Sequence, residues 1–193
     1  PKFPDIWAWL VPFANGRASV GVVGESHYFQ DDRAASKVMK KFVMEIPFFA
    51  RILQNAFWEN DAPFLFFSRY DSGVKQMYGD NFALLGNAAG FLDPVFSSGV
   101  TTAIYSSKLA CQAVTRQLRG EKVDWQKDYV EAHAYGINTL RNCIDSWYDG
   151  SFQELVFSNK PSPELREALC SVFAGYAWDT ENPFIRDVHA GLI

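Results

Sequence analysis

One segment constrains the fold more than any other: residues 84–100, which read LLGNAAGFLDPVFSSGV. An apolar run ends there in a turn of Gly and Ala, Asp93-Pro94 follows, and Ser97-Ser98-Gly99 precedes a long helical pattern. Small residues let a backbone approach a ligand closely, and a helix N-terminus presents N–H groups to a negative group. The segment therefore predicts a strand, glycine turn and helix that form part of a ligand site. Capping of the helix by Ser97 or Ser98 is the alternative.

The first part of the chain predicts a β-hairpin over residues 6–25. Residues 6–13 are an apolar and aromatic strand, and residues 17–23 are the returning strand. Between them, Asn15-Gly16 is the dipeptide preferred by two-residue type I′ turns. Further strands are expected at residues 63–72 and 81–90.

Helical spacing of apolar residues dominates the rest of the chain. Helices are expected over residues 31–46, 99–119, 124–148 and 159–178, with Asp31 or Asp32 capping the first and Ser162 the last. In the helix at 99–119, one face should carry Ile104, Cys111, Val114 and Leu118, and the next helix should carry one stripe of Tyr129, His133, Gly136, Leu140, Cys143 and Trp147. The fold class is therefore α+β, with strands first and a mainly helical C-terminal half.

Composition excludes several classes of protein. The net charge of -4, with no run of Lys or Arg, argues against a nucleic-acid surface, and no apolar run is long enough to span a bilayer. Cys111, Cys143 and Cys170 form no CxxC pair, so reduced thiols in a cytoplasmic protein are expected and no zinc site. His27, His133 and His189 are scattered, so no metal site is predicted. The aromatic content of 16% suits a flat ligand or simply a packed core, and Tyr70, Tyr78, Trp147, Tyr148 and Trp178 are candidates to line a cavity.

Two motifs carry a resemblance to a known family. Residues 84–100 resemble the second flavin motif of the aromatic-hydroxylase superfamily of FAD proteins, and residues 93–100 are most similar to its FAD-dependent, tryptophan halogenase-like members that act on phenolic, pyrrolic or aliphatic substrates. Residues 7–12, WAWLVP, are similar to the family motif W-x-W-x-I-P, carried here by Trp7, Trp9 and Pro12. The resemblance covers most of residues 6–120.

The resemblance implies FAD as the cofactor. Its contacts would come from Gly86, Asn87, Pro94, Ser98, Gly99 and Val100. The first two would meet the ribityl and pyrophosphate part, and the other four would lie beside the isoalloxazine. The backbone amides of Ser98 and Gly99 match the halide-binding amides of the family.

The sequence departs from the family pattern at three points. Asn87 stands where Asp is usual, and it can accept a hydrogen bond but adds no charge. Phe96 occupies the place of the catalytic Glu of tryptophan halogenases, which argues against tryptophan as the substrate. The GxGxxG turn and the family's catalytic lysine are absent, so the catalytic residue is unknown. We therefore expect the C-terminal portion of such an enzyme, with a partial FAD- and substrate-binding domain at 1–120 and a helical region at 121–193.

The intact enzyme would use reduced FAD, oxygen and chloride or bromide, and it would depend on a separate flavin reductase. Its substrate would be a small or carrier-tethered aromatic molecule, phenolic or pyrrolic rather than tryptophan. Two alternatives stay open at this point. One is a related FAD-dependent monooxygenase or reductase, and the other is a non-catalytic remnant that serves as an interaction domain.

Overall fold

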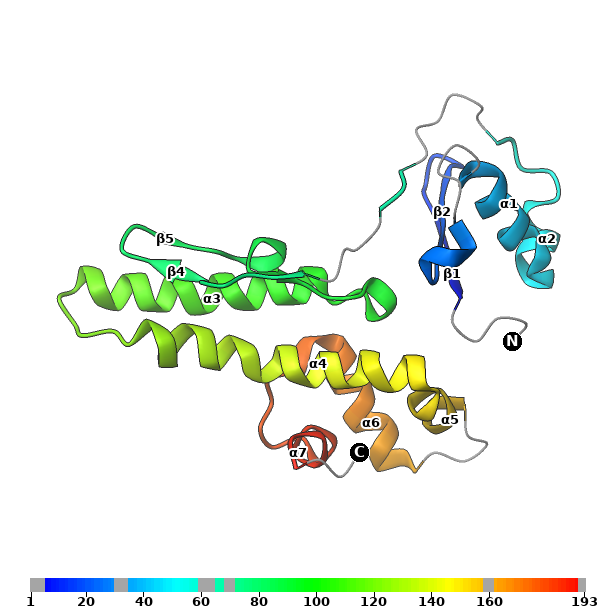
Figure 1. Ribbon diagram of the computed structural model, residues 1–193. Coiled ribbons are helices and arrows are strands. Elements are labelled where there is room, and N and C mark those ends of the chain that lie inside the picture. Colours follow the sequence, from blue (N-terminus) through cyan, green and yellow to red (C-terminus); the bar gives the residue numbers. More distant parts are fainter. Residues whose placement is uncertain (1–5, 30–34, 59–64, 68–71, 158–161, 191–193) are drawn as a thin grey trace. The chain divides into compact units, whose positions relative to one another are not determined.

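A computed structural model describes residues 6–29, 35–58, 65–67, 72–157 and 162–190. The chain forms two compact units, residues 1–68 and 69–193. The first unit holds a strand hairpin and two α-helices, and the second holds short strands and the remaining α-helices (Figure 1). The expected boundary at residue 120 would separate a cofactor- and substrate-binding domain from a helical region, and it stays a prediction.

In the first unit, β1 (Trp7–Pro12) and β2 (Ala18–Val23) form the expected antiparallel hairpin. Trp9 pairs with Gly21, and a Cβ on Gly21 would overlap the indole, at 2.0 Å from its Cζ2. Glycine here leaves room for the ring to lie across the neighbouring strand. The indole Nε1 donates to Ser19 Oγ at 3.1 Å, which fixes the ring over β2.

The turn of this hairpin differs from the expected two-residue type I′ form. Gly16 N donates to Phe13 O at 3.1 Å and Phe13 N donates to Arg17 O at 2.8 Å, so Ala14, Asn15 and Gly16 make a longer loop. Within this loop only Gly16 has a positive φ, 81°, as in a type I turn followed by a glycine bulge. Asn15 Oδ1 accepts a hydrogen bond from Arg17 N at 3.1 Å, a local bond that stabilises this turn instead.

Two short helices complete the described part of the first unit. α1 (Ala35–Glu45) packs on β2, contains the fully buried Val43 and ends before Pro47, and α2 (Pro47–Leu53) begins at that proline. A 3₁₀ turn, η1 (Ser26–Phe29), precedes them. The caps expected at Asp31 or Asp32 lie outside the described residues. Of the strand expected at 63–72, residues 65–67 have no regular structure, whereas Ser72 begins a short strand, β3 (Ser72–Gly73).

The strands of the second unit are very short. β3 (Ser72–Gly73) pairs with β6 (Gly90–Phe91), and β4 (Tyr78–Gly79) pairs with β5 (Phe82–Ala83), both antiparallel. The buried strand expected at 81–90 is therefore mostly wrong, since Phe82 is 50% exposed and the chain leaves the strand at Leu84. The physical reason is the left-handed Gly86, which bends the chain into the 3₁₀ turn η3 (Gly86–Ala88). An extended FAD-type sheet stays a prediction.

Helices form the bulk of the second unit, as expected. They are α3 (Gly99–Leu118), the π-helical turn η5 (Gln126–Glu131), α4 (Ala132–Asp149), α5 (Ser151–Phe157), α6 (Pro163–Ser171), the π-helical turn η6 (Val172–Tyr176) and α7 (Pro183–His189). α3 and α4 run side by side, and the hydrophobic core lies where α4 meets α5, α6 and α7 (Figure 1). Among the described residues, no helix combines the length and apolarity needed to cross a bilayer.

The stripe predicted for residues 124–148 is the buried side of its helix, whereas the apolar face predicted for α3 is exposed. On α4 and η5, Tyr129, His133, Gly136, Leu140 and Cys143 are buried, and Trp147 is half-buried. On α3 the buried residues are instead Thr102, Ser106, Ala110 and Ala113, whereas Ile104, Cys111, Val114 and Leu118 are exposed. Small side chains on the inner face allow the glycine turn to lie directly on α3: a Cβ on Gly86 would be 2.9 Å from that of Ala103.

Candidate functional site

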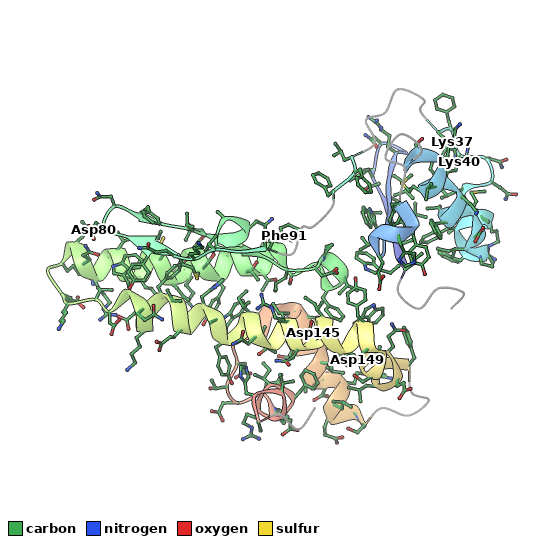
Figure 2. All side chains as sticks on the ribbon, in the orientation of Figure 1. Lys37, Lys40, Asp80, Phe91, Asp145 and Asp149 are labelled. Atoms are coloured by element: carbon green, nitrogen blue, oxygen red, sulfur yellow. The ribbon has the colours of Figure 1, made fainter. Side chains whose placement is uncertain are left out.

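A hollow of about 190 Å³ lies at the N-terminus of α3. It is lined by Asn87, Phe91, Leu92, Pro94, Ser97, Ser98, Gly99, Val100 and Thr102. Phe91, at the end of β6, is labelled in Figure 2. Small-molecule pockets usually measure about 300–1,000 Å³, so the described residues form part of a site rather than the whole of one.

The loop between β6 and α3 shapes one side of the hollow. Asp93 Oδ1 accepts a hydrogen bond from Val95 N at 2.9 Å, and Pro94 opens the 3₁₀ turn η4 (Pro94–Phe96). Ser97 follows with a left-handed φ of 53°, the only positive φ at a non-glycine residue in the described part of the chain. Such a conformation is uncommon for serine and must be held by its surroundings. It redirects the chain so that α3 begins two residues later, at Gly99.

The first turn of α3 has no side-chain cap. Ser98 occupies the N-cap position, but its side chain makes no capping hydrogen bond. By contrast, Ser162 Oγ accepts from Leu165 N in α6, and Asn182 Oδ1 accepts from Phe184 N and Ile185 N in α7. An uncapped helix start exposes N–H groups together with about half a positive charge. The hollow therefore has an electropositive wall of backbone amides.

The glycine turn closes the other side and is held by buried polar bonds. Gly86 N donates to Ser106 Oγ at 2.9 Å, and that hydroxyl donates to Ala103 O at 3.0 Å. The next residue, Asn87, is exposed and lines the hollow, with its Oδ1 3.7 Å from the position of a Cβ on Gly99. The turn thus places an amide side chain beside the start of α3.

A tyrosine from the π-helical turn η5 supports the same glycine turn. Tyr129 is fully buried, and its hydroxyl donates to Leu84 O, two residues before Gly86. Burial raises the pKa of Tyr129, so the hydroxyl keeps its proton and remains a donor. π-Helical turns often mark functional sites because the extra residue re-aims side chains.

Aromatic side chains hold the loop side in place. Phe96 stacks on Phe173 with ring centroids 4.5 Å apart and meets Phe152 and Trp147 edge-on at 5.4 and 5.8 Å. These rings come from α4, α5 and η6, so the C-terminal helices reach the loop directly. The Tyr148 hydroxyl adds a hydrogen bond to Asp93 Oδ2 at 2.9 Å.

Comparison with known proteins identifies the family. A model of the tryptophan halogenase family matches residues 4–154. The chain belongs to the tryptophan halogenase family. The resemblance seen in the sequence is thereby confirmed.

Relatives of this family member include halogenases of two bacteria. A 1H-pyrrole-2-carbonyl-[peptidyl-carrier protein] chlorinase of Pseudomonas fluorescens is 30% identical over 147 residues, which cover 75% of this chain and 31% of the relative. The corresponding brominase of Pseudoalteromonas luteoviolacea is 23% identical over 181 residues, 91% of this chain and 43% of the relative. The chain thus spans less than half the length of these halogenases.

Solved structures of flavoproteins share the fold. A flavoprotein/dehydrogenase from Cytophaga hutchinsonii matches with a TM-score of 0.83 and 37% identity, over 96% of this chain and 46% of that one. A flavin-dependent brominase matches with a TM-score of 0.76 and 20% identity, over 98% of this chain and 48% of that one. A flavin cofactor therefore belongs to the family, and the individual contacts to it stay proposals.

The residues that the halogenase motifs single out lie in both units. Asn87, Pro94, Ser98, Gly99 and Val100 all line the hollow, and Gly86 is buried behind it. Trp7, Trp9 and Pro12 lie on β1 in the first unit. Of the predicted cavity aromatics, Trp147 packs on Phe96 and Tyr148 binds Asp93, whereas Tyr78 stacks on Trp125 and Trp178 on Tyr105. None of these four lines the hollow, and Tyr70 lies outside the described residues.

The histidines of this family member lie apart from the hollow. His27 contacts Glu25 at 3.1 Å on the surface, and His189 Nε2 lies 3.0 Å from Thr139 Oγ1. His133 is buried, and burial lowers its pKa, so the ring is neutral. The described residues bring together no set of three His, Cys, Asp or Glu that could hold a metal ion.

Proposed function

We propose that the chain forms the C-terminal part of a flavin-dependent halogenase that uses reduced FAD, oxygen and halide. One observation carries the proposal: the uncapped start of α3 and the residues of the flavin motif line the same hollow. Among the curated relatives are halogenases that act on carrier-bound pyrroles and on sulochrin. The whole protein is expected in the cytoplasm, in keeping with the three free cysteines.

The residues of the hollow fit one part of a flavin. Gly99 and Val100 offer exposed backbone at the electropositive helix start, and Asn87 offers an amide that can bond a ribityl hydroxyl. Reduced flavin, when bound, supplies the electrons that activate oxygen for oxidation of the halide. The sequence has no GxGxxG turn to bind the adenine half of FAD, so the 193-residue chain alone should bind FAD weakly or not at all.

We propose that the backbone amides of Ser98 and Gly99 bind the halide. Both residues line the hollow, and no side-chain cap occupies the first turn of α3. A helix N-terminus favours an anion through its free N–H groups and its dipole. The chain offers matched controls in α6 and α7, whose N-termini are capped by Ser162 and Asn182.

The proposed substrate is an electron-rich ring such as a phenol or a pyrrole, free or tethered to a carrier. Phe96 replaces the carboxylate that tryptophan halogenases carry, and its ring is packed among other aromatic rings. Among the described residues, no carboxylate lines the hollow to accept the proton that halogenation releases. The substrate must therefore be activated already by its own hydroxyl or ring nitrogen.

The test is an assay of the full-length protein with a flavin reductase, FAD, chloride and a panel of phenols, pyrroles and tryptophan. Products that gain chlorine only when the reductase is present support the proposal. Oxygenated products formed with NADPH alone would show a single-component monooxygenase, and no turnover with no flavin binding would show a non-catalytic remnant. Robust chlorination of free tryptophan would contradict the inference from Phe96.

The proposed halide site at Ser98 and Gly99 can be tested separately, by soaking crystals of the flavin-bound full-length protein in bromide. An anomalous peak at the start of α3, with none at α6 or α7, is the expected result. A peak elsewhere near the flavin, with none at Ser98 and Gly99, would contradict the assignment.

A further inference from the structure

The loop that leads into α3 is held at both ends of η4 by one corner of the helical region, where α4 meets α5. At the start of η4, Asp93 Oδ2 accepts a hydrogen bond from the Tyr148 hydroxyl of α4 at 2.9 Å. At its end, the Phe96 ring meets Trp147 of α4 and Phe152 of α5 edge-on, with centroids 5.8 and 5.4 Å apart. The corner therefore contacts the loop twice, once through a polar bond and once through aromatic rings.

The end of α4 is itself fixed by local hydrogen bonds. Asp149, labelled in Figure 2, accepts at its Oδ1 from Ser151 N at 2.8 Å and from the Ser151 hydroxyl at 2.6 Å. On the other side of Tyr148, the carbonyl of Trp147 accepts from Gln153 Nε2 at 3.0 Å. Because both neighbours of Tyr148 in the chain are bonded to α5, its hydroxyl reaches the loop from a fixed base.

The Asp93 carboxylate transmits this position to the backbone of the loop. Its second oxygen, Oδ1, accepts a hydrogen bond from Val95 N at 2.9 Å, and Ser97 N donates to Pro94 O at 2.8 Å, which closes η4. The chain then turns at the left-handed Ser97, and α3 begins at Gly99. A displaced carboxylate would therefore move the backbone amides at the start of α3.

The bond between Tyr148 and Asp93 is better suited to setting geometry than to adding stability. Tyr148 is 40% exposed, so water can replace its partner when the bond is lost. The strength of an anion site depends steeply on where its donors lie, because preorganised backbone dipoles need no rearrangement when the charge arrives.

We propose that Tyr148 is a positioning residue of the halide site: its bond to Asp93 fixes the amides of Ser98 and Gly99 where an anion can bind both. This inference rests on the halide site proposed above. Tyr148 does not line the hollow, so it acts through Asp93 and not by contact with the halide. Its hydroxyl sets the affinity for halide, and the reaction at saturating halide does not depend on it.

The test is steady-state chlorination by the full-length protein, with FAD, a flavin reductase and the phenol or pyrrole that the parent chlorinates best, at varied chloride. Tyr148→Phe should raise the KM for chloride about fivefold, because the amides are no longer held in place. The kcat at saturating chloride should stay within a factor of about two, and the unfolding midpoint should change little. A parental KM, or a fall in kcat without a change in KM, would overturn the proposal.

Tyr135→Phe is the matched control. It makes the same atomic change on the same helix, at a ring that stacks on His189 of α7 with centroids 4.0 Å apart. This variant should keep both the KM for chloride and the kcat of the parent. An equal rise of the KM in both variants would show a general effect of changing α4 and would overturn the role of Tyr148.

Asp93→Asn tests whether Tyr148 acts through Asp93. The new side chain keeps an oxygen for Val95 N, but its amide nitrogen cannot accept a bond from the Tyr148 hydroxyl. The KM for chloride should rise, and the double variant with Tyr148→Phe should have a KM no higher than the larger of the two single variants. Increases that multiply in the double variant would show independent roles and would contradict the proposal.

Bromide soaks separate a failure of this inference from a failure of the halide site itself. Crystals of the flavin-bound full-length protein and of its Tyr148→Phe variant are soaked at the same subsaturating bromide concentration. A weaker anomalous peak at the start of α3 in the variant is the expected result. Equal peaks would leave the halide site in place and overturn the role of Tyr148. No peak at the start of α3 in the parent would overturn both.

Discussion

The two sides of the hollow are held in different ways. The glycine turn is fixed by polar bonds inside the protein: Gly86 N binds Ser106 Oγ, and the buried Tyr129 hydroxyl binds Leu84 O. The loop side is fixed by ring packing around Phe96 and by an exposed hydrogen bond between Tyr148 and Asp93. A buried polar group that loses its partner is costly, whereas water replaces the partner of an exposed one. The glycine side should therefore be rigid and the loop side adjustable.

This difference suits a site that must hold a cofactor and admit a substrate. A rigid glycine turn keeps one wall of the hollow in a fixed position against α3. A loop that rests on aromatic rings can move by small rotations of those rings without leaving a polar group unpaired. Substitutions on the two sides test the contrast.

Replacing Gly86 by alanine should have the largest effect. Its φ of 52° is left-handed, and the new Cβ would lie 2.9 Å from Ala103 Cβ. Backbone strain and overpacking together should lower the free energy of unfolding by about 3 kcal/mol, as measured by urea denaturation. Gly120→Ala is the matched control, because its φ of 79° is also left-handed but no atom lies within 4 Å of its Cβ position. The control should lose only about 1 kcal/mol. Equal losses in the two variants would show that the packing around Gly86 relaxes to admit the new Cβ.

Phe96→Ala should have the next largest effect. The ring is half-buried and contacts Trp147, Phe152 and Phe173, so its removal should lower the free energy of unfolding by about 2 kcal/mol. Phe157→Ala removes a ring that is 70% exposed and should change stability by about 0.5 kcal/mol or less. If Phe96→Ala cost more than Gly86→Ala, the loop side would be the more rigid of the two.

Tyr129→Phe and Tyr148→Phe compare the two sides by the same atomic change. Loss of the Tyr129 hydroxyl leaves Leu84 O without its buried donor and should cost about 1–2 kcal/mol. Loss of the Tyr148 hydroxyl breaks an exposed bond to Asp93 and should cost about 0.5 kcal/mol or less. Thermal unfolding of both variants beside the parent protein measures the difference. A larger loss at Tyr148 would reverse the comparison.

Much of the local structure of this chain could be predicted, but not which surfaces meet. Alternation in residues 6–25 and the Asn15-Gly16 pair located the hairpin, although a local Asn15 bond changed the turn type. Ser162 and Pro163 located the start of α6. On α3, periodicity identified residues that share one face, but that face is exposed, and the small residues opposite it are buried. Periodicity reports which residues share a face, and the partner of that face depends on contacts far along the chain.

The candidate site shows the same division. Its lining, apart from Thr102, lies within the local segment 84–100, so the motif was sufficient to find the lining residues Asn87, Ser98 and Gly99. The residues that hold the lining were missed, because Ser106, Tyr129 and Tyr148 bind partners 20, 45 and 55 residues away. Tyr129 had one signal, its place on the helical stripe predicted for residues 124–148, where a hydroxyl that becomes buried needs a hydrogen-bond partner. The π-helical turn that aims it leaves no sequence signal that we recognise.

The smallest expected effect is a dependence of stability on pH, and it comes from His133, which lies beside Tyr129. His133 stacks beside Tyr129, and its Nε2 has no hydrogen-bond partner among the described residues. Burial lowers the pKa of His133 below its ordinary value of 6.5, so the unfolded chain takes up a proton at a higher pH than the folded protein does. Stability from this residue is therefore complete above pH 6.5 and falls as the pH is lowered through that value.

The urea midpoint measured from pH 7.5 to pH 5.5 tests this linkage. The parent protein should lose stability over this range, and His133→Gln, which is neutral throughout, should lose less of it. His27→Gln is the control, because it replaces a histidine whose side chain is 54% exposed in the folded protein. If His133→Gln kept the full pH dependence of the urea midpoint, another buried group would be its source. A neutral His133 would then make no contribution to the stability of the structure around Tyr129. If the dependence were lost with His27→Gln instead, the surface pair with Glu25 would be its source.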